Sequence, residues 1–160
     1  MLHEVMIVLH AGAAILCFAF GALTLSPRLS RQSRGDVFTY YFILLVAMIA
    51  FLAGAILAHV SQLNPVQRGV FAGLFGLSLY MLLRGVQAGA VLCAHRGDWL
   101  PRYIDHIGFT LIALFEGFII VAAIDLGAPG WLTAGLAVLG VIGGNRMLHR
   151  LQIHGNRPTT

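Results

Sequence analysis

The stretch GVFAGLFGLSLYMLLRGVQAGAVLCA, residues 69–94, decides the fold. It is apolar and longer than the roughly 20 residues that a helix needs to cross a bilayer, yet it carries Arg84 near its middle. At 3.6 residues per turn, Tyr80, Arg84 and Gln87 share one face of the predicted helix. A charged side chain at that depth costs at least ~2.5 kcal/mol unless it faces protein and finds a partner. The stretch therefore predicts a membrane helix whose polar face is turned toward a neighbouring helix.

The composition of the whole chain agrees with an integral membrane protein. Of the 160 residues, 59% are hydrophobic and only 10% are charged, whereas soluble domains carry about 25% charged residues. The mean hydropathy is +0.87. All ten basic residues are arginines, and eight of them lie in three short connecting or terminal segments. This placement indicates membrane orientation and not a nucleic-acid surface, so nucleic acid is excluded as a partner.

The apolar runs predict an all-α integral membrane protein, with residues 1–160 forming a single transmembrane domain. A chain of this length has room for five spans of ~20 residues and short connections. We expect five transmembrane helices in an up-down bundle, at about residues 2–25, 37–60, 69–94, 103–126 and 131–147.

The arginines predict which way the bundle faces. In the five-span arrangement, one side of the membrane receives eight of them, namely Arg28, Arg31, Arg34, Arg96, Arg102, Arg146, Arg150 and Arg157. Only Arg68 falls on the other side. Because positively charged segments stay cytoplasmic, we expect the N-terminus outside and the C-terminus in the cytoplasm, in a cytoplasmic (inner) membrane of bacterial type.

The partner predicted for Arg84 is Glu116, in the next apolar run. Arg84 lies 11 residues before His95, and Glu116 lies 11 residues after Asp105. At 1.5 Å per residue, both would be ~16 Å from the cytoplasmic surface, near the middle of the bilayer. The pair could fix helix register, or it could form an interior polar site together with Tyr80 and Gln87.

Three histidines are candidates for a cofactor site on the outer side. His3 and His10 share a face of the first predicted span, and His59 ends the second. Imidazoles of this kind could bind a transition metal through His3, His10 and His59, or hold a b-type haem between His10 and His59. The alternative is that these histidines are hydrogen-bonded to backbone or water at the membrane interface.

Part of the chain resembles a group of small bacterial multi-span membrane proteins of unassigned function. The resemblance lies in His10-Ala11-Gly12, in Gly21-Ala22-Leu23, and in Arg31 to Gly35 followed by the aromatic start of the second span. This chain differs in having Gln32-Ser33-Arg34-Gly35 where a His-Arg sequence is expected. The resemblance implies a helical bundle and assigns no residue a role.

Three functions are compatible with these patterns. The favoured hypothesis is a non-enzymatic accessory or structural subunit of a membrane assembly, whose partners are the lipid bilayer, other membrane subunits or further copies of the chain. Small-residue pairs such as Gly69/Gly73 favour such lateral packing. The second hypothesis is a redox protein that binds haem b or quinone through His10 and His59. The third is a small-solute or proton carrier centred on Arg84 and Glu116. Phosphate-binding loops and hydrolase motifs are absent from the sequence.

Overall fold

The computed structural model describes residues 2–59, 65–94 and 97–126, and within them every regular element is an α-helix. The helices are α1 (Leu2–Thr24), α2 (Arg31–His59), α3 (Pro65–Ala94) and α4 (Trp99–Asp125). Each is long and apolar enough to cross a membrane. Four of the predicted spans are thereby confirmed as helices, and the fifth, at residues 131–147, lies outside the described part of the chain.

Three helices begin earlier than the sequence suggests, α2 at Arg31, α3 at Pro65 and α4 at Trp99, because each has a local starting signal. Proline is favoured at the first position of a helix, as at Pro65. Ser30 caps α2: its hydroxyl accepts a hydrogen bond from the Ser33 amide at 3.2 Å, and its carbonyl accepts one from the Arg34 amide at 2.9 Å. The segment around Arg31 is thus helical and not a polar loop. Before α4, Gly97 adopts a positive φ of 56°, a conformation that glycine tolerates at no steric cost.

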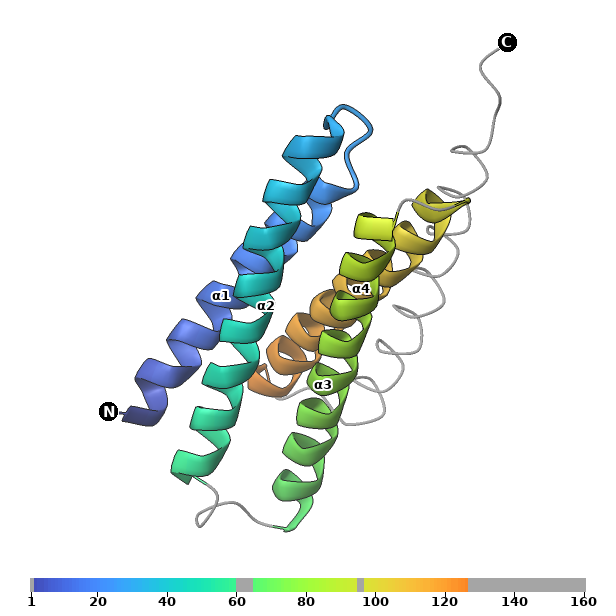
Figure 1. The fold of residues 1–160 in the computed structure, drawn as a ribbon. Helices are drawn as coiled ribbons and strands as arrows, with labels where there is room; N and C mark the ends of the chain where they lie inside the picture. The colour runs from blue at the N-terminus through green and yellow to red at the C-terminus, as the bar shows by residue number, and fades with distance from the viewer. Residues whose placement is uncertain (1, 60–64, 95–96, 127–160) are drawn as a thin grey trace. The chain divides into compact units, whose positions relative to one another are not determined.

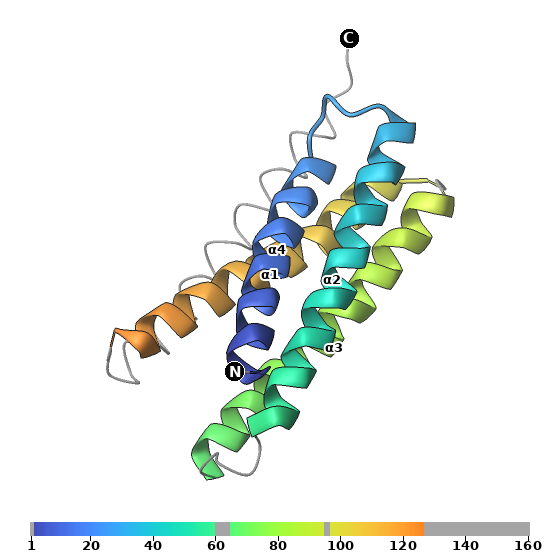
Figure 2. The same ribbon diagram turned by 90° about the vertical axis from the view of Figure 1, so that its left-hand side faces the viewer.

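The chain divides into two compact units, Met1–Leu83 and Arg84–Thr160, so α3 contributes to both. In the first unit, α1 and α2 pack closely as an antiparallel hairpin, side by side in both ribbon views (Figure 1, Figure 2). Small residues allow this approach: on α1, Ala13 and Ala14 are buried, and on α2, a Cβ atom added at Gly54 would lie 3.4 Å from the Met6 sulfur. Close backbones let van der Waals contact stabilise helices that lipid does not drive together.

Two polar side chains of α1 fix its register on α2. His10 Nδ1 donates a hydrogen bond to the Met48 carbonyl at 2.9 Å, and the Cys17 thiol donates to the Tyr41 carbonyl with an S···O distance of 3.7 Å. The two donors are seven residues apart on α1, and the two acceptors are seven apart on α2. This equal spacing follows two helical turns on each helix, as expected for an antiparallel pair.

Buried positions in the second unit recur at helical spacing. On α4 they include Tyr103, Ile107, Thr110 and Leu114, and the first three of these are fully buried. Intervals of three and four residues place them on one stripe of the helix. The opposite stripe of α4 carries Asp105, Phe109 and Glu116, and the first two of these contact Arg84 of α3.

Candidate functional site

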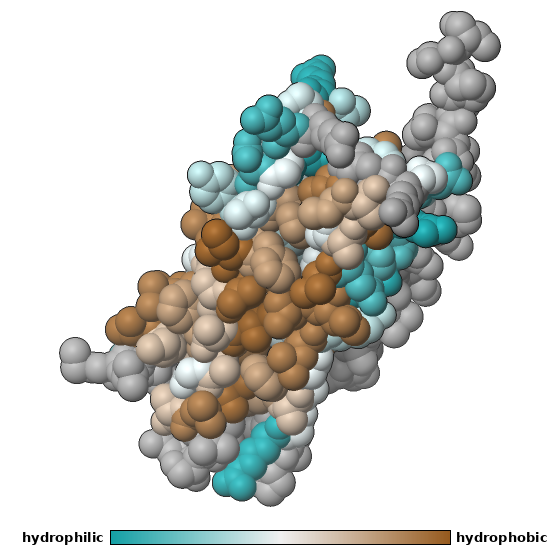
Figure 3. Space-filling view, viewed as in Figure 1, coloured by the Kyte–Doolittle hydropathy of each residue, from teal (hydrophilic) through white to brown (hydrophobic). Residues whose placement is uncertain are grey.

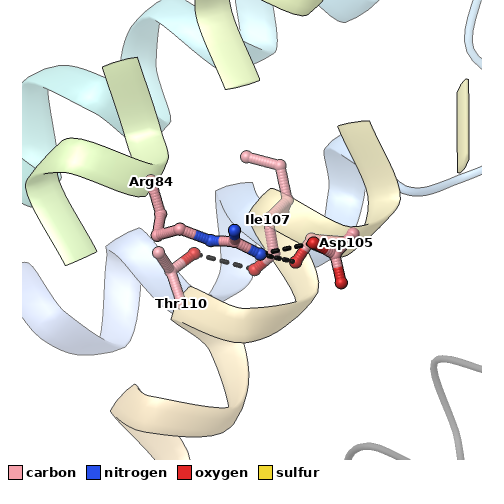
Figure 4. Close-up of polar contacts among 4 residues, drawn as sticks. All are labelled: Arg84, Asp105, Ile107 and Thr110. Atoms are coloured by element: carbon pink, nitrogen blue, oxygen red, sulfur yellow. Dashed lines mark hydrogen bonds and ion pairs between the residues drawn. The ribbon is translucent and has the colours of Figure 1, made fainter. Parts of the chain in front are cut away.

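In the second unit, Arg84 of α3 forms an ion pair with Asp105 of α4 (Figure 4). The Arg84 Nη2 atom donates to the Asp105 carboxylate at 2.5 Å and to the Asp105 backbone carbonyl at 3.3 Å. The Arg84 side chain is 17% exposed, whereas the Asp105 side chain is 51% exposed. The arginine side chain is therefore mostly enclosed, and its charge is neutralised by a carboxylate whose side chain is about half exposed.

Neighbouring residues of α4 complete the surroundings of the guanidinium. Its central carbon lies 5.4 Å from the centre of the Phe109 ring, within the range of a cation–π contact. Thr110, drawn beside Arg84 in Figure 4, donates its hydroxyl to the Ile107 carbonyl at 2.7 Å. An arginine held by a carboxylate, a carbonyl and an aromatic face has its position well defined.

The predicted pairing of Arg84 with Glu116 is wrong, and the partner is Asp105. The predicted depth of Glu116 takes Asp105 as the start of the helix, but α4 begins at Trp99, six residues earlier. Asp105 is thus ~9 Å below the start of α4, while the Arg84 backbone is ~15 Å below the end of α3. The long arginine side chain covers this difference by extending toward the helix ends, where its charge is less costly.

Glu116 consequently has no counter-charge from Arg84. Its Oε1 atom is buried and has no hydrogen-bond partner among the described residues. Glu116 lies 11 residues beyond Asp105 on the same face of α4, ~16 Å along the helix axis. The same holds for the Nδ1 atom of His106, which is buried without a hydrogen bond within the described chain. Of these two groups, Glu116 is the one that the sequence predicts to lie beside the arginine.

The other members of the predicted interior polar site, Tyr80 and Gln87, are not enclosed. Tyr80 is 46% exposed, and Gln87 is also exposed. Both lie on the same side of α3 as the exposed glycines 69, 73 and 76. The structure therefore brings Arg84 together with α4 but leaves Tyr80 and Gln87 on the surface of α3.

The outer histidines are only partly described. His10 is engaged by the Met48 carbonyl through Nδ1, which leaves Nε2 as the nitrogen that could accept or ligate. His59 is 11 residues beyond Met48 on α2, so it lies ~16 Å from the level of His10. Axial ligands of one haem must meet at one level, so this register does not fit a haem held between His10 and His59.

The side chains that the structure describes do not form a metal site around His10. Within those residues, no three His, Cys, Asp or Glu side chains come together as a metal site would require. The side chains of His3 and His59 lie outside the described set. His10 is instead hydrogen-bonded to a backbone carbonyl, which is the structural role expected of a histidine that binds no metal or haem.

The geometry defines a class of protein: within the described residues every regular element is a helix, and four long apolar helices that could span a membrane are stabilised by polar contacts between neighbours. No known protein family, curated protein or solved structure matches the chain. The residue that sequence reasoning missed is Asp105. The sequence contains a pattern that could have pointed to Asp105 as the partner of Arg84. Once the helix is taken to begin at Trp99, Asp105 and Phe109 lie about one turn apart on a single face.

Proposed function

We propose that the protein is a non-enzymatic subunit of a membrane assembly that acts through lateral contacts between its helices and those of a partner. The share of buried residues in the four described apolar spans is only 22% to 28%. Many large apolar side chains are correspondingly exposed, such as Val8, Leu57 and Val86 at 70%, 74% and 53%. The polar contacts at Arg84 and His10 join helices of the chain to each other, which is a structural use of polar groups.

The observation that carries this proposal is an exposed glycine face on α3. Gly69, Gly73 and Gly76 follow one another at intervals of four and three residues, and all three are exposed. A Cβ atom built at any of them would meet no atom within 4 Å. Small residues at this spacing let another helix approach closely in a membrane, where close packing is a main source of association. We call this surface, formed by Gly69, Gly73 and Gly76, the α3 glycine face.

A leucine at the centre of the α3 glycine face tests the proposal. We expect the wild-type protein, extracted in mild detergent, to run as a complex of defined mass larger than the 17.2 kDa chain. Gly73→Leu is expected to weaken that association at least ~10-fold, because the side chain would hold the helices apart and each 1.4 kcal/mol is tenfold. Native mass spectrometry of the extracted protein measures the stoichiometry.

The matched control is Gly12→Leu. Gly12 lies on α1, is exposed, and likewise has open space around a built Cβ. It adds the same bulk to an apolar helix away from α3, so the complex is expected to survive. A chain that is monomeric in every mild detergent, or equal losses in both variants, would refute the proposed role of the α3 glycine face.

The proposal includes five membrane crossings, with the N-terminus outside and the C-terminus cytoplasmic. Support comes from the arginine distribution, in which the turn with Arg28 and the start of α4 with Arg102 share one side while Arg68 falls on the other. The crossings are the four described helices and a fifth at residues 131–147. An inner membrane of bacterial type is the setting that this orientation assumes.

The number of crossings is testable with reporters at the C-terminus. A reporter active only in the cytoplasm, fused after Thr160, is expected to be active, and one active only outside is expected to be inactive. Fusion after Asp125 removes the proposed fifth span and is expected to reverse both signals. An unchanged side in the truncated fusion would rule out the fifth crossing.

A further inference from the structure

The turn between α1 and α2 is a built, positively charged feature at one end of the helical hairpin. Arg28 is exposed on it, and the Ser26 hydroxyl accepts from the Arg28 amide at 3.4 Å. Arg34, from the first turns of α2, donates through Nη2 to the Ser26 carbonyl at 3.1 Å. This contact ties the turn to the helix that follows it. We call residues 26–36 the basic turn.

Aromatic side chains lie next to the basic turn on the side of the apolar helices. The Phe20 and Tyr40 rings have centroids 5.7 Å apart, and Tyr40 is 58% exposed. Exposed tyrosines of spanning helices sit at the boundary between hydrocarbon and headgroups. Arg34 and Arg31 come six and nine residues before Tyr40 on α2. At 1.5 Å per residue, the ~9 Å of helix between Tyr40 and Arg34 crosses a headgroup layer of about 5–7 Å, so the start of α2 lies at the aqueous edge of the headgroups.

The chemistry of the basic turn suits a phosphate. It holds Arg28, Arg31 and Arg34 against a single carboxylate, Asp36, so its net charge is positive. The exposed hydroxyls of Ser30 and Ser33 are 2.8 Å apart, and their mutual bond uses one of the two hydroxyl hydrogens. The other hydrogen is left to donate to an anion. Figure 3 shows hydrophilic residues gathered at this end, beyond apolar helix flanks.

We propose that the basic turn binds the phosphate of an anionic glycerophospholipid. The net positive charge of the turn, on which Arg28 is exposed, attracts the headgroup, and the hydroxyl pair of Ser30 and Ser33 donates a hydrogen bond at the N-terminus of α2. The start of a long helix favours an anion, and the arginine fork matches phosphate oxygens. The lipid source is favoured over a free anion because the aromatic boundary places the start of α2 at the edge of the headgroups. This inference does not depend on the proposed subunit role.

The test compares lipid binding by the full chain and its variants. Purified protein is incubated with phosphatidylglycerol or phosphatidylcholine in mixed micelles, and bound lipid is counted by native mass spectrometry. We expect the wild type to prefer phosphatidylglycerol. Arg28→Gln with Arg31→Gln is expected to reduce that preference about fivefold for each charge removed, from the known attraction of basic residues near anionic membranes.

Three controls keep the result interpretable. Arg68→Gln removes an exposed arginine near the start of α3, at the other end of α2, and is expected to leave the preference unchanged. Thermal stability in phosphatidylcholine alone shows whether the double variant is folded; if it is not, Ser30→Ala with Ser33→Ala replaces it. Inorganic phosphate at millimolar concentration should not compete. Equal loss in Arg68→Gln, no preference in the wild type, or full competition by free phosphate would each overturn the proposal.

Discussion

Replacing Asp105 with alanine is expected to lower the free energy of unfolding by about 2 kcal/mol, because an enclosed guanidinium loses its counter-charge. Arg84 would keep the cation–π contact to Phe109, but its charge would be unbalanced beside an apolar helix. The estimate is below that for a fully buried pair, since the Asp105 side chain is 51% exposed. Unfolding by denaturing detergent, followed by circular dichroism, measures the change.

Two further variants distinguish the observed Arg84–Asp105 ion pair from a pairing of Arg84 with Glu116. Arg84→Leu with Asp105→Leu removes both charges and is expected to recover most of the lost stability, as often happens when both members of an ion pair are replaced by apolar residues. Glu116→Gln is expected to change stability by less than ~0.5 kcal/mol, because Glu116 makes no ion pair with Arg84. A large loss in Glu116→Gln, with none in Asp105→Ala, would contradict the observed pairing.

The second large effect is expected for Ala14→Leu in the α1–α2 hairpin. Ala14 is 4% exposed and lies between His10 and Cys17, whose side chains bond to α2. A leucine there would push the helices apart, at a cost of about 1–3 kcal/mol for overpacking. Separation would also stretch the two interhelical hydrogen bonds, each worth about 0.6 kcal/mol in a membrane protein. We expect a total loss of about 3 kcal/mol in the same unfolding assay.

Ala19→Leu is the matched control, because Ala19 is on the same helix but exposed. It adds an identical side chain to the outward face and is expected to leave stability within ~0.5 kcal/mol of wild type. The histidine ring signal in NMR spectra gives a second readout, since the His10 ring should lose its hydrogen bond only in Ala14→Leu. Equal destabilisation by the two variants would mean that tight α1–α2 packing is not what stabilises the hairpin.

Sequence reasoning located four helices because long apolar runs carry a strong and local signal. It misjudged where three of them begin, because the signal there is a single residue: Ser30 before α2, Pro65 at the start of α3 and Gly97 before α4. Such residues also occur in loops and turns, so the apolar pattern alone placed the boundaries too far inward. The error at α4 then carried over into the depth assigned to Glu116.

Side-chain partners were harder to predict than helices, because they depend on reach and on interhelical register. An arginine side chain is long enough to reach a carboxylate at a different depth along the helix axis, and Arg84 reaches Asp105 in this way. Likewise, nothing local in the sequence states that His10 faces the Met48 carbonyl. That register is set by small residues along the whole contact, and it separated His10 from His59.

The paired hydrogen bonds of α1 also limit how the first two helices can move. A shift of α1 along its axis by one residue, ~1.5 Å, would carry His10 and Cys17 away from the Met48 and Tyr41 carbonyls at the same moment. Because both hydrogen bonds would break together, the two helices have one preferred axial position relative to each other. Extra residues inserted after Ser26 would accordingly be absorbed as a longer bend, while the helices on either side kept their alignment.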